Sequence, residues 1–120
     1  MVELIEESIF EKKINFMFRG IEVELSEQSD GKYNFVPNPV DKTWHIYRAR
    51  DDNIIDKIFN FFSDKDGVPI AILRYRQFHE EEFFEVETST YAFKHERAVI
   101  YRKTESFAED LGYTFNNLDS

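Results

Sequence analysis

The sequence contains no cysteine, which excludes disulfide scaffolds, thiolate metal sites and cysteine nucleophiles. Its 4 glycines are not clustered, so it carries no phosphate-binding glycine loop. No apolar run approaches the length of a membrane span, and the first ten residues carry acids where a secretory signal needs bases. These absences predict a cytoplasmic protein that neither enters nor crosses a membrane.

Basic residues are scarce relative to acidic ones: 15 lysines and arginines stand against 24 aspartates and glutamates, a net charge of −9. The acidic surplus is concentrated in residues 1–30 and 61–90. Binding to a nucleic-acid backbone needs lysine and arginine, so no direct nucleic-acid partner is expected. A protein partner with a basic surface fits this charge better.

What the chain does have is apolar and aromatic material. Hydrophobic residues make up 42% of its 120 residues, and 13 of these are phenylalanines, enough to fill the core of a single domain spanning 1–120. Core filling accounts for most of the aromatic side chains, and the remainder would suit a protein interface.

The pattern of apolar residues predicts an α+β fold. We expect a mostly antiparallel sheet of about five to seven strands, with one main amphipathic helix at about 53–63 packed on one face and short terminal helices. Asp51 or Asp52 would cap the main helix.

The clearest strand signal is a hairpin formed by Ile70–Phe78 and Phe83–Thr88, joined by a loop at 79–82. Pairing the last residue of the first strand with the first residue of the second brings opposite charges together on one face: Arg76 with Glu85 and Arg74 with Glu87. Such cross-strand pairs stabilise an antiparallel ladder.

The other elements follow from the same alternation of apolar and polar residues. A short helix is expected at 2–13, strands at 32–36, 43–50, 91–93 and 98–103, and a short closing helix from 106 that ends at Gly112, before a loose tail at 116–120. The strand at 32–36 would fold back against the strand ending near Leu25, and the prolines at 37 and 39 would then break that ladder.

Residues 14–25 allow two interpretations, because the parity of the apolar positions switches between Phe18 and Ile21. Two strands could meet in a turn at Arg19-Gly20, or one long strand could contain a bulge at Gly20.

Charged side chains supply the candidate binding residues. The acids most suited to a basic partner are Glu22, Glu24, Glu80, Glu81 and Glu82. Four arginines recur in pairs along strands and form either a possible anion site or a solvated face of ion pairs: Arg48, Arg50, Arg74 and Arg76.

No catalytic residue, metal site or cofactor is predicted. The segment 79–82, His-Glu-Glu-Glu, lacks the second histidine of a zinc-protease motif. The three histidines are far apart in the sequence, and His45 is the one expected to be partly buried.

Three functional hypotheses remain open. The first is a small protein-binding module, acting stoichiometrically as an inhibitor, immunity or anti-defence protein on a basic partner such as a nuclease. The second is a ligand-binding or catalytic pocket in a curved sheet, using His45 or His95 beside a carboxylate. The third is a structural homo-oligomer whose edge strands pair between chains.

Overall fold

The computed structural model describes residues 9–28, 32–49 and 67–119 of the chain. In chain order, their helices and strands are α1 (Ile9–Gln28), β1 (Tyr33–Asn38), β2 (Thr43–Arg48), β3 (Val68–Phe78), β4 (Glu81–Thr88), α3 (Lys94–Leu111) and β5 (Thr114–Asn117). The α+β class is confirmed. The helix expected at about 53–63 lies outside the described residues.

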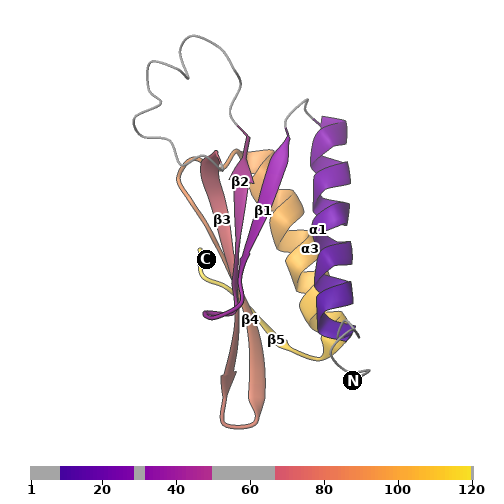
Figure 1. Ribbon diagram of the computed structural model, residues 1–120, viewed down its shortest axis with the longest axis vertical. Coiled ribbons are helices and arrows are strands. Elements are labelled where there is room, and N and C mark those ends of the chain that lie inside the picture. The colour runs from indigo at the N-terminus through magenta and orange to yellow at the C-terminus, as the bar shows by residue number, and fades with distance from the viewer. Residues whose placement is uncertain (1–8, 29–31, 50–66, 120) are drawn as a thin grey trace.

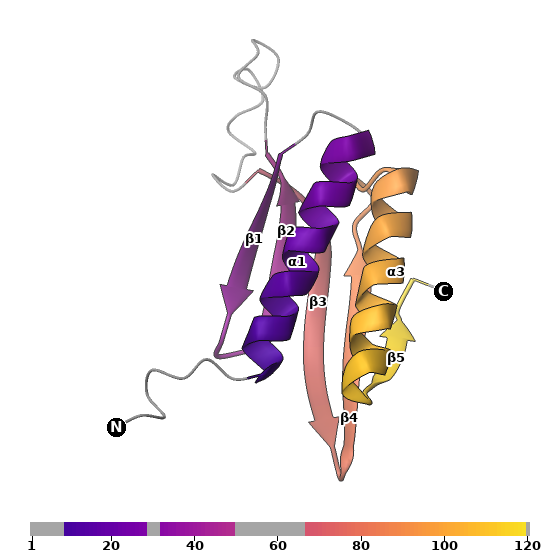
Figure 2. The same cartoon turned by 90° about the vertical axis from the view of Figure 1, so that its right-hand side faces the viewer.

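The five strands form one sheet in the order β1-β2-β3-β4-β5. The pairings from β1 to β4 are antiparallel, as expected, whereas β5 returns through α3 to lie parallel to β4. Both described helices pack side by side against one face of this sheet (Figures 1 and 2). Neither of them is long and apolar enough to cross a membrane.

The core lies between that sheet face and the two helices. Its most deeply buried large apolar side chains expose 2% of their surface or less: Ile14, Ile21, Leu25, Ile46, Ile70, Leu73, Phe84, Val86, Val99 and Ile100. Burying one such side chain contributes roughly 1.5–3 kcal/mol. The helices therefore form a fixed layer over the sheet, from which surface side chains are positioned.

The predicted hairpin is present as β3 and β4, but its register differs from the expected one by two residues. Phe78 pairs with Glu81, so the turn consists of His79 and Glu80 alone. His79 has a φ of 57°, the left-handed conformation that such a tight turn requires at its first position. Histidine adopts this conformation more readily than most residues.

A shift of two residues leaves each side chain on its expected face, because side chains alternate with period two. The specific pairs nevertheless change: Arg74 lies opposite Glu85, and Arg76 lies opposite Phe83. The expected placement of Arg76 opposite Glu85 and of Arg74 opposite Glu87 was therefore wrong, although each residue is on its expected face. Arg76 still forms an ion pair with Glu85, across the diagonal, at 3.6 Å.

The two strand interpretations of residues 14–25 were wrong, because α1 continues through this segment. Its buried positions are spaced three and four apart, as one helix face requires: Ile14, Met17, Phe18, Ile21 and Leu25. The switch in apolar parity near Gly20 arises because buried helix positions are three or four residues apart, not two. Of the helix expected at 2–13, only residues 9–13 are described, and they form the start of α1.

The strands expected at 91–93 and 98–103 were also wrong. Helix α3 begins at Lys94 and runs through both the second segment and the expected closing helix. Its start is capped by the Glu96 side chain, which accepts a hydrogen bond from the Phe93 N–H at 2.8 Å. Gly112 ends the helix as predicted, with a φ of 77°.

The tail is not loose within its described part. Residues 114–117 form β5, and Asp119 accepts hydrogen bonds from the Thr88 N–H at 2.9 Å and from its hydroxyl at 2.7 Å.

At the other edge of the sheet, β1 pairs with β2 and not with the segment near Leu25, which is helical. The expectation that Pro37 breaks the ladder was wrong: Pro37 lies within β1 and pairs with Trp44, because an edge strand tolerates its missing N–H.

Candidate functional site: an aromatic hollow beside an acidic hairpin

Four partly exposed aromatic side chains from distant parts of the chain line a hollow of about 360 Å³. They are Phe10 of α1, Trp44 of β2, Tyr75 of β3 and Tyr113, which follows α3; Glu11, Pro39 and Lys42 complete the lining. Aromatic side chains of this size are normally buried in a core or used at interfaces. A group of four at the surface therefore marks a candidate binding site.

The rings contact one another edge-on or tilted. The centroid of Phe10 lies 5.5 Å from that of Trp44 and 5.7 Å from that of Tyr75, and Tyr75 lies 5.5 Å from Tyr113. Phe10 also contacts the buried Phe107 of α3 at 5.7 Å. Because the rings rest on the core, the hollow is held open by packing.

The Glu82 carboxylate lies next to the hollow and acts on two of its tyrosines. The Tyr75 hydroxyl donates to Glu82 at 2.9 Å. Burial and this carboxylate raise the pKa of Tyr75 to about 12, and burial together with the negative charge of Glu82 also raises the pKa of Tyr113. One carboxylate therefore acts on two of the four rings.

The Lys42 side chain places a cation against one of the aromatic rings. Its ammonium lies 5.4 Å from the centroid of the Tyr75 ring, within cation–π range. Its backbone is fixed, because φ is 54° and its carbonyl accepts the Tyr75 N–H at 3.0 Å. The side chain itself is exposed to solvent.

The acidic hairpin tip continues from the hollow. Glu80 and Glu81 are exposed at the β3–β4 turn and Glu82 is half-buried; the strand partners of Glu81 and Glu82 are Phe78 and Gln77, neither of them basic. Three of the five predicted partner-binding acids thus lie at the hairpin tip. Of these, Glu82 lies beside the aromatic rings, whereas Glu81 belongs to the opposite sheet face.

The other two predicted acids, Glu22 and Glu24, lie in the C-terminal half of α1, at the opposite end of the molecule from the hairpin tip (Figure 1). Glu24 forms ion pairs with Arg102 and, at 3.7 Å, with Lys103 of α3. The structure does not bring all five predicted acids into one patch.

The predicted arginines do not gather either. Arg74 and Arg76 lie on the sheet face away from the helices, 3.8 and 3.6 Å from the buried Glu85. Arg48 lies on the helix side, where it pairs with Glu96. Arg50 is outside the described residues.

Arg48 occupies a site that resembles the aromatic hollow. Its guanidinium lies 4.1 Å from the centroid of the Phe93 ring and donates to Glu96 at 2.9 Å. Glu96 is fully buried and also accepts the Tyr33 hydroxyl at 2.6 Å. A tyrosine, a glutamate and an aromatic ring here enclose a cation from the protein itself.

The histidines are placed apart from the hollow. His45 is half-buried, as predicted, next to Tyr47 on the face away from the helices. His95 lies in the first turn of α3, with its Nε2 buried and without a hydrogen-bond partner. Within the described ranges, histidines and acids form no cluster of three that could hold a metal ion.

Sequence analysis did not identify the four aromatic residues of the hollow as a site. They are separated by up to 103 positions in sequence, from Phe10 to Tyr113, so only the fold brings them together. The available signal was the aromatic content of 17% in a chain of net charge −9.

No protein-family model matches this sequence, and no curated protein and no solved structure resembles it significantly.

Proposed function

We propose that this protein is a protein-binding module that takes a lysine or arginine side chain of a basic partner into the aromatic hollow. Support comes from one arrangement above all: four partly exposed aromatic rings beside Glu82 at an acidic hairpin tip. A cation over an aromatic face gains about 0.5–1 kcal/mol when exposed and about 2 kcal/mol when desolvated. A nearby carboxylate adds to this attraction.

The site around Arg48 supports the same chemistry. There the protein's own guanidinium lies against a ring, and its charge is met by a glutamate that also accepts a tyrosine hydroxyl. Beside the hollow, aromatic rings, the Tyr75 hydroxyl and the Glu82 carboxylate could meet a cation from a partner in the same way.

The hollow's lining favours binding over catalysis. It contains no histidine, serine or threonine, and the hydroxyl of Tyr75 is held by Glu82 with a raised pKa, so it is not readily ionised as a nucleophile. We therefore propose a stoichiometric role, such as inhibition of a basic enzyme in a reducing cytoplasm, and place the ligand-binding or catalytic alternative second.

Affinity capture with purified variants tests this function. We expect a basic protein to be retained by the wild type at low salt and released at high salt, because steering by surface charge is screened. The variant Glu80→Gln/Glu81→Gln/Glu82→Gln should no longer retain the basic protein at low salt. A control variant, Glu105→Gln/Glu109→Gln, removes two exposed acids of α3 and should still retain the basic protein.

The proposal would be contradicted if the triple variant retained the basic protein as well as the wild type does. It would also be contradicted if retention by the wild type did not change with salt concentration.

A further inference from the structure

The outer side of α1 carries a line of exposed apolar side chains, none of which belongs to the lining of the hollow. Ile9, Phe16 and Val23 expose 70%, 79% and 53% of their surface. Their spacing of seven residues places them along one line of a helix. In a helix whose opposite face is fully used by the core, this second apolar line indicates a second contact surface.

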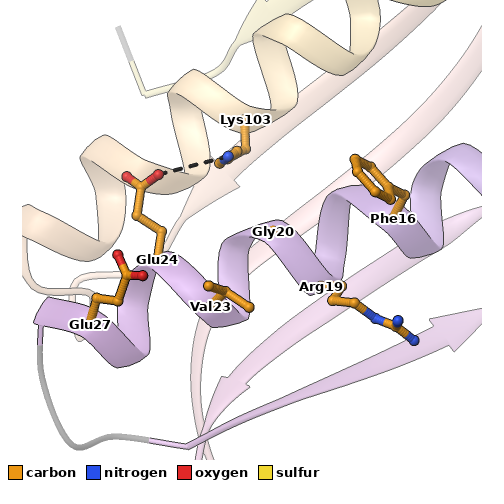
Figure 3. Close-up of a pocket in the computed structure, with 7 residues that line it drawn as sticks. All are labelled: Phe16, Arg19, Gly20, Val23, Glu24, Glu27 and Lys103. Atoms are coloured by element: carbon orange, nitrogen blue, oxygen red, sulfur yellow. Dashed lines mark ion pairs between the residues drawn. The ribbon is translucent and has the colours of Figure 1, made fainter.

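The line borders a shallow hollow between α1 and α3. Its volume is about 330 Å³, and Phe16 and Val23 lie on either side of Gly20 (Figure 3). Gly20 has no side chain, and the flexible Lys103 side chain of α3 lies beside it, so a second helix could approach the backbone there once Lys103 moves aside. Small residues at such positions allow helices to approach closely.

Charge is separated along α1 in a way that complements itself. The basic residues of the helix occupy its N-terminal part, and most of its acidic residues follow them. In order these are Lys12, Lys13 and Arg19, and then Glu22, Glu24 and Glu27. Two copies of α1 that pack antiparallel would bring the basic part of each against the acidic part of the other.

We propose that this surface binds a second copy of the same chain, with the two α1 helices antiparallel and crossing near Gly20. A twofold axis there places Phe16 of each copy against Val23 of the other, and Lys12 against Glu27. An interface about a twofold axis uses the same patch twice, as this pairing does. Lys12 and Glu27 are both exposed, and neither is engaged in an ion pair with the described residues.

This dimer would use α1 rather than the sheet edge considered from the sequence. The edge strand β1 carries Pro37, which reduces its capacity to pair with another strand. The aromatic hollow lies outside the proposed interface, so the dimer and the proposed function can be tested independently of each other.

Analytical ultracentrifugation of the full chain over a range of concentrations tests the dimer. We expect the wild type to dimerise reversibly and Phe16→Asp to raise the dimer Kd by about a hundredfold, since each interface contains two copies of the change. Phe78→Asp is the matched control, because Phe78 is 62% exposed at the distant hairpin. Its dimer Kd should equal that of the wild type.

A charge-reversal cycle tests the antiparallel arrangement itself. Lys12→Glu and Glu27→Lys should each raise the dimer Kd by about tenfold, and the double variant should restore it. The two positions are 15 residues apart in one helix, so they cannot compensate for each other within one chain.

A wild type that stays monomeric at the highest concentration would overturn the proposal. So would a dimer that Phe16→Asp leaves intact, or a double variant no better than the single ones. Circular dichroism of each variant checks that the exposed substitutions leave the fold unchanged.

Discussion

Two sites in this molecule combine a tyrosine, a glutamate and aromatic rings, and they differ in the source of the cation. In the first, the Tyr33 hydroxyl donates to Glu96 at 2.6 Å and Arg48 completes the site. In the second, the Tyr75 hydroxyl donates to Glu82 at 2.9 Å, and the nearest cation on the rings is an exposed lysine side chain.

The difference in burial explains the difference in role. Glu96 is fully buried, so its negative charge must be compensated within the protein. Glu82 is partly exposed beside an open hollow, so water or a partner can compensate it. The first site therefore holds the start of α3 against the sheet, whereas the second is available to a partner.

The largest expected effect is on stability, at the closed site. Glu96→Gln leaves the Arg48 guanidinium without its carboxylate and should lower the free energy of unfolding by about 3 kcal/mol. Glu82→Gln should lower it by no more than about 1 kcal/mol, since its partner hydroxyl can be solvated. Urea unfolding measures both, and equal losses would remove the distinction between the two sites.

A smaller effect is expected on the opposite sheet face, where Arg74 and Arg76 flank Glu85. Replacing both arginines with glutamine should lower the free energy of unfolding by about 2 kcal/mol. The two guanidinium groups are exposed and screened, but the buried Glu85 loses both of its cations. Thermal unfolding with and without phosphate checks whether they also bind an anion. A phosphate-dependent stabilisation that the double variant loses would assign these arginines to a binding site.

The smallest effect is on the pH dependence of stability. The pKa of Tyr75 rises from its ordinary value of 10.0 to about 12 in the folded state, through burial and the Glu82 carboxylate. The folded state therefore holds this proton more tightly, and the resulting stability is present below pH 10 and is lost as the pH rises towards 12.

Alkaline unfolding of the wild type and of Tyr75→Phe measures this contribution. The variant lacks it, so its stability should fall less steeply over that pH range. Identical slopes would show that Tyr75 titrates as in the unfolded chain and that Glu82 does not act on the hollow.

The hairpin shows how far alternation in the sequence carries. Alternation identified both strands and the face of each side chain, because a register shift of two residues changes neither. The register itself depended on whether the turn has two or four residues. His79 in a left-handed conformation decided that, and histidine is not the residue that usually signals such a turn.

Helix α1 was missed because of its exposed apolar residues. Phe16 and Val23 lie two residues from buried positions, so Ile14, Phe16 and Phe18, and then Ile21, Val23 and Leu25, imitate the alternation of strands. Residues that contradict the local pattern are often those selected for another purpose. The two side chains that misled the prediction are those proposed here to contact a second copy.

The aromatic hollow could not be predicted from sequence, since it depends on the packing of α1 across the sheet and on the chain after α3. The acidic hairpin tip could, because Glu80, Glu81 and Glu82 are consecutive. Only the structure shows that Glu81 and Glu82 have no basic residue opposite them on β3, whereas Glu24 is paired with Arg102.

The most direct test of the open site uses Trp44, the only tryptophan of the chain, as a reporter within the hollow. Its fluorescence is followed during titration with a short peptide containing one arginine, and with the same peptide containing citrulline, which has the same shape without the charge. We expect saturable binding of the arginine peptide, about tenfold weaker binding of the citrulline peptide, and a comparable loss in Glu82→Gln. Equal binding of the two peptides, or no saturable change with either, would contradict the account.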